Sequence, residues 1–334
     1  MNKISNDKKL DLTHKIKTSY SNLIAEIGKI IVGQEKTIDS IITALLCNGH
    51  CLLIGVPGLA KTLIVKTVSK TLDLNFNRIQ FTPDLMPADI LGSDILQIDK
   101  ETKDRYFKFS KGPIFTNILL ADEINRTPPK TQSALLESMQ ELSVTAGGQK
   151  YELDKPFLVL ATQNPIEQEG TYPLPEAQLD RFMFSIKLNY PSFEEESVII
   201  KNTTFNLEQN IENVFTKSEL LETQKIIRDI LISDELINFI LNITRASRPE
   251  TTNIEEIKKN VNWGAGPRAS QYITLAAKAS ALLNGRLYCI KEDVLKNIYN
   301  VLGHRIILNF NAAASNISVE NIIDLLIKEC KKNN

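Results

Sequence analysis

The sequence lacks several features that would mark a secreted or membrane-spanning chain. It has only four cysteines and no CxxC pair in 334 residues, and it has no apolar run of 18 residues. Scattered thiols of this kind indicate buried side chains in a reducing compartment rather than a disulfide framework or a metal site. Without a long apolar run, no membrane-spanning helix is expected, and the polar first residues contain no signal-peptide core. We therefore expect a cytoplasmic protein.

The sequence also lacks an excess of charge of either sign. Its formal net charge is -1, with 43% hydrophobic and 24% charged residues, which is ordinary for a globular protein. The overall charge therefore does not indicate a nucleic-acid or membrane-surface partner. The length suits one large domain or two of medium size.

What the sequence does contain is an alternation of strand-like and helical patterns up to about residue 190. Helical spacing covers residues 10–30, a turn follows at Gly33, and a second helix comes next. Short apolar runs then indicate strands, and helical patterns separate most of them: residues 51–56, 78–82, 117–122, 157–163 and 182–188. Such alternation predicts a parallel sheet covered by helices on both faces.

Two segments interrupt this alternation, and the character of the chain changes after it. Residues 93–115 and 143–157 have the alternating pattern and turn residues of β-hairpins. Beyond residue 190, strand signals largely vanish and helical periodicity continues. We therefore predict a first domain over residues 1–190 with two inserted hairpins, and a small helical domain over residues 191–334.

The stretch "GVPGLAKTL" breaks an apolar strand with glycines before a helix begins. Glycines let the backbone curl so that successive N–H groups point inward, and the following helix adds the positive end of its dipole. This pattern predicts a cradle for the phosphates of a nucleotide, with Lys61 reaching the β- and γ-phosphates and Thr62 binding Mg²⁺. The residues expected to contact the nucleotide are Gly55, Pro57, Gly58, Leu59, Ala60, Lys61, Thr62 and Leu63.

One position departs from the common GxxxxGK[ST] pattern of such loops. Ala60 stands where a second glycine is usual. Alanine does not take a strongly positive φ cheaply, so we expect Gly58 to supply that freedom instead.

A phosphate loop requires a partner carboxylate at the end of a neighbouring strand. The apolar run "NILLA" leads directly to Asp122 and Glu123, 61 residues after Lys61 (122 − 61). We expect Asp122 to hold Mg²⁺, directly or through water, and Glu123 to act as the general base that orients the attacking water.

Three later polar residues each allow two interpretations from the residues alone. Asn164 follows the fourth strand-like run and either senses the γ-phosphate or starts a turn before a proline. Arg181 either pairs locally with Asp180 or points off the edge of the subunit toward a neighbour's ATP. Arg268, beside the proline that opens a helix, either reaches back to the phosphates or lies on the surface.

The order of these motifs resembles that of the AAA+ ATPases, and within them the MoxR family. The matching segments include "IVGQE", "GVPGLAKT", "FTPDLMPADILG", "LLADEINRTPPKTQSALLESMQE", "ATQNP", "LPEAQLDRF" and "GAGPRAS", and they cover about residues 20–310. The resemblance implies a three-layer αβα P-loop NTPase core with a parallel five-stranded sheet, followed by a small all-helical lid. Alanine at the position of Ala60 is typical of that family.

The resemblance also implies roles that spacing alone does not give. Val32 and Gly33 would lie near the adenine. Asn164 would be the sensor-1 residue, Arg181 the arginine finger and Arg268 the sensor-2 arginine, while Arg126 could act at a subunit boundary. Active members of the family are similar to hexameric rings, work beside proteins with von Willebrand factor A domains, and remodel client proteins or complexes.

The favoured function is therefore an ATPase motor that uses ATP and Mg²⁺ to remodel a client. The alternatives are a nucleic-acid motor, a magnesium chelatase-like subunit for metal insertion, and a degenerate nucleotide-binding scaffold without activity. The hairpin segment "DKETKDRYFKFSKG" carries basic residues and aromatics that suit a nucleic-acid backbone. It also carries acidic residues, which weakens that alternative.

Overall fold

The computed structural model describes residues 6–166, 170–204 and 210–332, and its α/β part is built on one sheet. The ends of the predicted domains, residues 1–5 and 333–334, lie outside the described residues. The five strands of the sheet are β1 (Cys51–Ile54), β2 (Phe76–Gln80), β5 (Ile118–Asp122), β8 (Leu158–Gln163) and β9 (Phe184–Lys187). They pair in the order β2-β5-β8-β1-β9, and each neighbouring pair is parallel. The predicted parallel five-stranded sheet is confirmed.

The strand order corrects one expectation about the site. We expected Asp122 at the end of a strand next to the strand of the phosphate loop, but β8 lies between β1 and β5. Strands in a sheet are roughly 4.8 Å apart, so the ends of β1 and β5 are separated by about 10 Å. The order of motifs along the chain cannot show that a later strand is inserted between two earlier ones.

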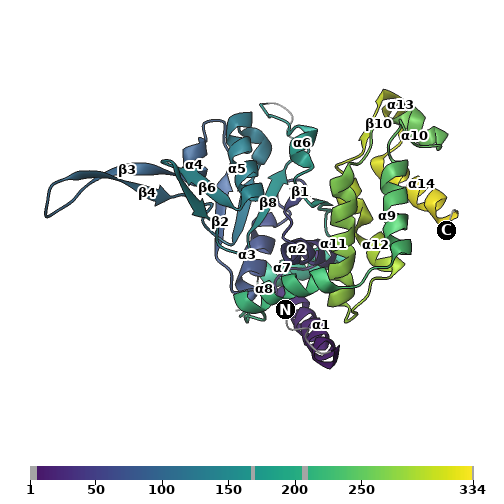
Figure 1. The fold of residues 1–334 in the computed structure, drawn as a ribbon, viewed down its shortest axis with the longest axis horizontal. Helices are drawn as coiled ribbons and strands as arrows, with labels where there is room; N and C mark the ends of the chain where they lie inside the picture. Colours follow the sequence, from purple (N-terminus) through teal and green to yellow (C-terminus); the bar gives the residue numbers. More distant parts are fainter. Residues whose placement is uncertain (1–5, 167–169, 205–209, 333–334) are drawn as a thin grey trace.

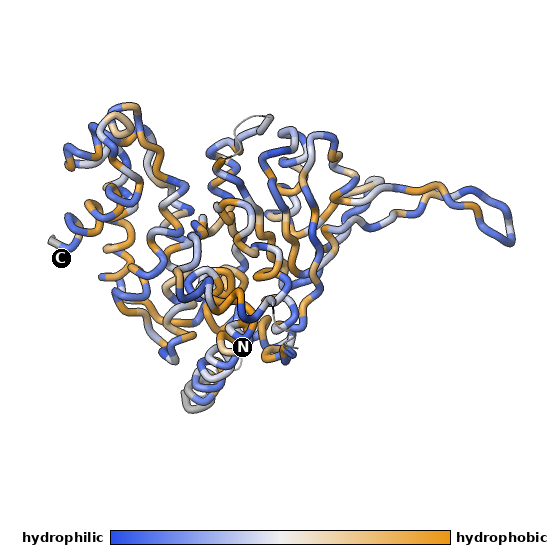
Figure 2. The backbone as a smooth tube through the Cα atoms, turned by 180° about the vertical axis from the view of Figure 1, so that it is seen from behind, coloured by the Kyte–Doolittle hydropathy of each residue, from blue (hydrophilic) through white to orange (hydrophobic). Residues whose placement is uncertain are grey.

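Helices cover both faces of the sheet (Figure 1). The α/β part contains α2 (Glu35–Leu46), α3 (Lys61–Thr71), α4 (Pro87–Leu91), the short 3-10 helix Ile124–Arg126, α5 (Pro129–Glu141) and α6 (Glu176–Leu179). Alternate residues of β1 enter different apolar clusters: Leu53 packs in the cluster that contains residues of α2 and α3, and Leu52 in the cluster that contains residues of α5. A strand buried on both faces needs this layered arrangement. Figure 2 shows hydrophobic residues concentrated along these central elements.

The second half of the chain is mostly helical. Its helices are α7 (Phe193–Thr204), α8 (Lys217–Asp229), α9 (Asp234–Ala246), α10 (Glu255–Asn260), α11 (Pro267–Leu283), α12 (Lys291–Leu302), α13 (Phe310–Ala314) and α14 (Val319–Lys332). A small antiparallel pair, β10 (Val261–Trp263) and β11 (Ile307–Leu308), is an addition that the sequence pattern does not indicate. No helix within the described ranges is both long and apolar enough to cross a membrane.

The two halves share a continuous apolar core. The N-terminal helix α1 (Asn6–Gly28) contacts both α3 of the α/β part and α11 of the helical part. One cluster of buried hydrophobic residues includes Leu53 of the sheet, Ile41 of α2 and Ile273 of α11. The domain boundary near residue 190 therefore stays a prediction, although the sheet ends and the helices begin close to that point.

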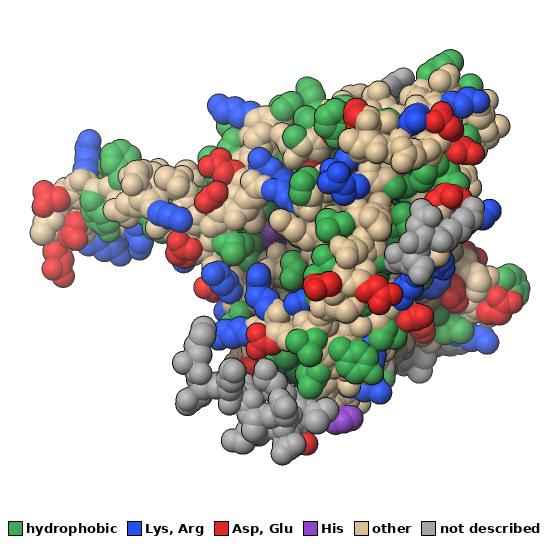
Figure 3. Space-filling model, turned by 45° about the vertical axis from the view of Figure 1, so that its right-hand side comes forward, with side chains coloured by type: hydrophobic (Ala, Val, Ile, Leu, Met, Phe, Trp, Pro, Cys, Tyr) green, Lys and Arg blue, Asp and Glu red, His purple; other side chains and the backbone are tan. Residues whose placement is uncertain are grey.

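Both inserted hairpins are confirmed. The first consists of β3 (Gly92–Ile98) and β4 (Arg105–Lys111), and the second of β6 (Ser143–Ala146) and β7 (Gln149–Glu152). We call the β3–β4 hairpin the arm, because it projects far from the body (Figure 1). Leu96 and Phe107 face each other across it and are 50% and 72% exposed. Figure 3 shows hydrophobic side chains exposed along the arm and charged ones gathered toward its far end.

All four cysteines are buried, as their scatter predicts. Burial raises the pKa of the Cys47 thiol to about 12. His50, next to Cys51, has a structural role: Val159 N–H donates to its Nδ1 at 3.0 Å, and its Nε2 faces the Met139 carbonyl at 3.1 Å. Because Nδ1 accepts, Nε2 carries the proton, and the neutral ring joins the end of α5 to β8.

The neutral state of His50 predicts a pH-dependent contribution to stability. Burial lowers the pKa of His50 from 6.5 to about 4, so the unfolded chain takes up this proton at a higher pH than the folded chain. His50→Leu removes both hydrogen bonds and is expected to cost about 3 kcal/mol of unfolding free energy at pH 7. That difference should shrink as the pH falls from 6.5 to 4, because protonation of the unfolded state destabilises only the wild type. Urea unfolding of both proteins across this range is the measurement, and a difference that does not change with pH would contradict the assignment.

Candidate functional site

The loop after β1 has the backbone that phosphate binding needs. Residues 55–60 join β1 to α3, which begins at Lys61. Gly58 has a φ of +88°, and Ala60 itself has a φ of +52° and a ψ of 25°. We expected Gly58 to take the positive φ in place of Ala60. Gly58 does so, but the expectation for Ala60 is wrong, because its φ is positive as well. A left-handed alanine costs roughly 1–2 kcal/mol, so the surrounding loop holds it there.

The N-terminus of α3 opens onto this loop. Ala60 is the N-cap residue and makes no side-chain capping bond, so it satisfies none of the N–H groups of the first turn. Lys61 folds back over the loop, and its Nζ donates to the Gly55 carbonyl at 2.6 Å. At Gly55 an added Cβ would lie 2.9 Å from the Cβ of Leu188, so the loop packs closely on the segment after β9. An ammonium group and a helix N-terminus without a side-chain cap thus lie in one loop, as an anion site requires.

Asp122 stands at the end of β5 with both carboxylate oxygens engaged. Thr162 of β8 donates to Oδ1 at 2.6 Å. Arg78 of β2 donates to Oδ2 through Nη2 at 2.7 Å and through Nε at 3.1 Å. The Arg78 side chain is 46% exposed, so displacing it from the carboxylate costs little. The carboxylate of Asp122 and the hydroxyl of Thr62 are oxygen donors of the kind that Mg²⁺ prefers, so the residues present fit that ion.

Glu123 is held by its neighbours in an unusual backbone conformation. Its φ is +57°, and its N–H donates to the Thr162 hydroxyl at 2.8 Å. Its Oε2 accepts from Gln80 at 2.7 Å and from Arg126 at 2.9 Å. Backbone strain of this kind is concentrated at functional sites. The carboxylate is therefore restrained by two donors in this structure.

Asn164 comes directly after β8, between the ends of β1 and β5. It is 5% exposed, and its Oδ1 accepts from Ile166 N–H at 3.2 Å. The residue before it, Gln163, accepts from the N–H of Gly55 at 3.2 Å. The contact with Ile166 is the one expected if Asn164 starts a turn. The position beside the phosphate loop is the one expected if Asn164 senses the γ-phosphate. Its role as a sensor stays a prediction.

The local alternative for Arg181 does not hold. Asp180 accepts from Arg305 Nε at 2.7 Å and from Arg268 Nη1 at 3.3 Å, so its carboxylate is paired with other arginines. No ion pair to Arg181 appears within the described part of the chain. Arg268 crosses from α11 to the α/β part and ends at Asp180. The pairing of Arg181 with Asp180 is therefore not observed, Arg268 lies beside it, and the role of Arg181 at a neighbouring subunit stays a prediction.

The turn of Val32 and Gly33 lies beside the end of the sheet. Gln34 donates to the Asn189 carbonyl at 3.2 Å, and an added Cβ at Gly33 would meet the Glu195 carboxyl group at 2.4 Å. Gly33 has a φ of +76°. This turn thus packs between the segment after β9 and the first turn of α7, and its contact with adenine stays a prediction.

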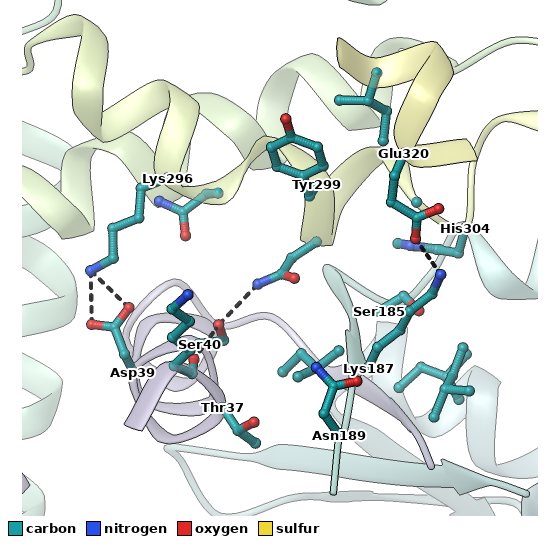
Figure 4. A pocket seen from close by; sticks show the side chains of 18 of the residues that line it. Thr37, Asp39, Ser40, Ser185, Lys187, Asn189, Lys296, Tyr299, His304 and Glu320 are labelled. Atoms are coloured by element: carbon teal, nitrogen blue, oxygen red, sulfur yellow. Dashed lines mark hydrogen bonds and ion pairs between the residues drawn. The ribbon is translucent and has the colours of Figure 1, made fainter. Parts of the chain in front are cut away.

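A cavity of about 920 Å³ lies beside the edge strand β9, between α2 and the helices α12 and α14 (Figure 4). Hydrogen bonds and ion pairs cross this gap: Lys296 to Asp39 at 2.7 Å, Asn300 to Ser40 at 2.9 Å, and Lys187 to Glu320. Its lining includes Ile54 and Gln163 but none of residues 55–63. The cavity therefore lies between the α/β and helical parts, next to the phosphate loop but not lined by its residues.

Several residues at the site escaped the sequence analysis. Gln80 and Thr162 lie at or next to the carboxyl ends of β2 and β8, and Arg78 lies two residues before the end of β2; these side chains contact Asp122 and Glu123. Their position at strand ends was the available signal, because the carboxyl ends of parallel strands meet at one edge. Arg305 had no comparable signal, since it lies 125 residues from Asp180 in the chain.

Comparisons with known proteins agree with this arrangement. Residues 50–184 match the family described as "ATPase family associated with various cellular activities (AAA)", and residues 255–325 match the AAA lid domain. The chaperone MoxR1 of Mycobacterium tuberculosis is 45% identical over 91% of this chain and 80% of its own length. The protein MoxR of Paracoccus denitrificans is 27% identical over 85% of this chain and 87% of its own. The crystal structure of a protein from Cytophaga hutchinsonii superposes with a TM-score of 0.88 at 44% identity, covering 95% of this chain and 96% of that one.

Proposed function

We propose, on the premise that this chain belongs to the MoxR family of AAA ATPases, that it binds ATP with Mg²⁺ and hydrolyses the nucleotide to remodel a client protein. The observation that carries the proposal is the meeting of three features at one edge of the sheet. The phosphate loop, the pair Asp122–Glu123 and Asn164 follow β1, β5 and β8, which are consecutive in the sheet. This is where open α/β folds bind ligands.

In this proposal the loop holds the triphosphate. The N–H groups of residues 58–62 and the N-terminus of α3 face the phosphates, and Lys61 exchanges the Gly55 carbonyl for phosphate oxygens. Thr62 and Asp122 would hold Mg²⁺. The ion, when bound, neutralises charge on the β- and γ-phosphates.

Glu123 is the proposed general base. In this proposal its carboxylate exchanges the contacts of Oε2 with Gln80 and Arg126 for the attacking water. Asn164 lies between the loop and β5 and orients the water. The two contacts hold the Glu123 carboxylate in place until the site is assembled.

Arg181 is proposed to complete the active site of a neighbouring subunit. An arginine that makes no ion pair with the described residues suits a finger that stabilises charge on the γ-phosphate in trans. This requires a homo-oligomer, and the family resemblance favours a hexameric ring. A protein with a von Willebrand factor A domain is the partner that the same resemblance favours.

The arm is the proposed contact with the client. A two-stranded hairpin with an exposed apolar face is only marginally stable alone, and such faces occur at interaction sites. Leu96, Ile98 and Phe107 supply that face, and Ile98 is 60% exposed. The client itself is not specified by these residues.

Removal of magnesium tests the proposed chemistry. The wild type is expected to release phosphate from ATP with Mg²⁺ present and to lose at least about 100-fold in rate with excess EDTA, because the γ-phosphate charge is then uncompensated. Addition of Mg²⁺ beyond the chelator should restore the rate. Undiminished hydrolysis in EDTA would contradict the role of Thr62 and Asp122.

A further inference from the structure

The segment that carries Arg181 is held by the helical part of the same chain. We call residues 180–183 the finger segment; it joins α6 to β9. Arg305, between α12 and β11, donates to three of its carbonyls: Asp180 at 2.9 Å, Phe182 at 2.6 Å and Met183 at 3.3 Å. The fourth carbonyl, of Arg181 itself, accepts from the Tyr272 hydroxyl at 3.4 Å. Four consecutive backbone acceptors thus depend on donors from the helical part.

Side-chain contacts reinforce this attachment. Arg305 Nε donates to Asp180 Oδ1 at 2.7 Å, while Arg268 approaches the other oxygen at 3.3 Å. His304 Nε2 faces the Phe182 carbonyl at 3.1 Å. The Arg305 side chain is 2% exposed and also donates to the Val301 carbonyl at 2.6 Å, which fixes its guanidinium to the end of α12. A buried guanidinium that satisfies one carboxylate and several carbonyls has a single favourable position.

We propose that Arg305 is a positioning residue for Arg181, so that the docked lid of each subunit sets the arginine finger which that subunit presents to its neighbour. The proposal rests on the proposed function of Arg181 in trans. It adds a link between the lid of one subunit and the hydrolysis of ATP in the next. Movement of α11 and α12 away from the α/β part would withdraw the donors from all four carbonyls and release the finger segment.

The link is tested by comparing Arg305→Lys with Arg181→Ala. A lysine keeps the charge but has three donors in place of the planar fork, so it cannot hold the carboxylate and all the carbonyls together. We expect kcat to fall at least about 10-fold, with affinity for a fluorescent ATP analogue within about 3-fold and an unchanged oligomeric mass. The double variant Arg181→Ala/Arg305→Lys should be no slower than Arg181→Ala alone, because both changes remove the same interaction.

Two further variants separate positioning from general stability. Asp180→Asn removes the charge that orients Arg305 without changing side-chain size, and it should lower kcat in the same way. Arg286→Lys weakens a comparable pair inside the helical part, since Arg286 contacts the 3% exposed Asp293 at 2.6 Å. This control should keep kcat within about 2-fold of wild type, because it does not contact the finger segment.

Mixed assemblies give the decisive readout. Glu123→Gln subunits have an inactive site but an intact finger, whereas Arg305→Lys subunits have an intact site but a displaced finger. An equal mixture should recover about a quarter of wild-type activity, the fraction of random interfaces that join an intact site to an intact finger. No recovery above the separate variants would overturn the proposal, as would an Arg305→Lys rate within 2-fold of wild type. If Arg181→Ala itself hydrolyses ATP normally, the finger assignment fails together with the inference.

Discussion

Glu123→Gln is expected to bind ATP and to hydrolyse it at least about 100-fold more slowly than the wild type, because an amide cannot accept the proton of the attacking water. The substitution keeps the size of the side chain and one acceptor oxygen for Gln80 and Arg126, which contact Glu123 at 2.7 and 2.9 Å. The fold and the phosphate loop should therefore be unaffected. Steady-state phosphate release and binding of a fluorescent ATP analogue measure the two parts of the effect separately.

A matched control is available on the next helix. Glu137 is an exposed carboxylate on α5, so Glu137→Gln makes the same chemical change away from the sheet edge. Its rate should stay within about 2-fold of the wild type. If Glu123→Gln hydrolysed ATP at the wild-type rate, Glu123 would not be the base, and the chain would fit the scaffold interpretation better than the motor.

Glu123→Gln also tests client remodelling. A subunit that holds ATP without hydrolysing it should retain clients that the wild type releases, so its ATP-dependent pull-down should be enriched in specific proteins. Replacing Leu96 and Phe107 of the arm by serine in the Glu123→Gln variant should abolish the capture of these proteins. The two side chains are 50% and 72% exposed and face each other across the hairpin. Equal capture with and without ATP would count against remodelling.

Lys61→Ala is expected to weaken ATP binding at least about 100-fold and to abolish hydrolysis. An ammonium group paired with phosphate oxygens in a partly enclosed loop contributes about 3 kcal/mol, and its loss leaves the phosphate charge facing only neutral amides. The variant also loses the 2.6 Å bond from Lys61 to the Gly55 carbonyl, which helps to shape the loop. Isothermal titration with ATP and Mg²⁺ measures the affinity.

Lys66 provides the control for this change. It is exposed on the same helix α3, five residues further along, so Lys66→Ala removes the same charge without reaching the loop. Its affinity for ATP should match that of the wild type within about 2-fold. Binding by Lys61→Ala within 3-fold of the wild type would remove the phosphate loop from the proposal.

The sequence by itself determined the elements of this fold and the residues of the loop. Period-two and helical patterns are local properties, so they located the five strands, both hairpins and the helical second half. The glycines before Lys61 and the carboxylates after "NILLA" also carry their chemistry in adjacent residues. The sequence shows that Ala60 departs from the usual loop pattern. It does not predict the left-handed backbone of Ala60, because the loop that imposes this conformation is held by contacts with Leu188 and Lys61.

Only the tertiary structure decided which strands are neighbours and which side chains meet. The insertion of β8 between β1 and β5, and the contacts of Thr162 and Gln80 with the acidic pair, depend on strand pairing across the sheet. The docking of Arg305 on residues 180–183 depends on the packing of the two halves. Such contacts join residues from 39 to 125 positions apart in the chain. A local pattern cannot encode them, because their geometry is fixed only when the apolar faces of separate elements are buried together.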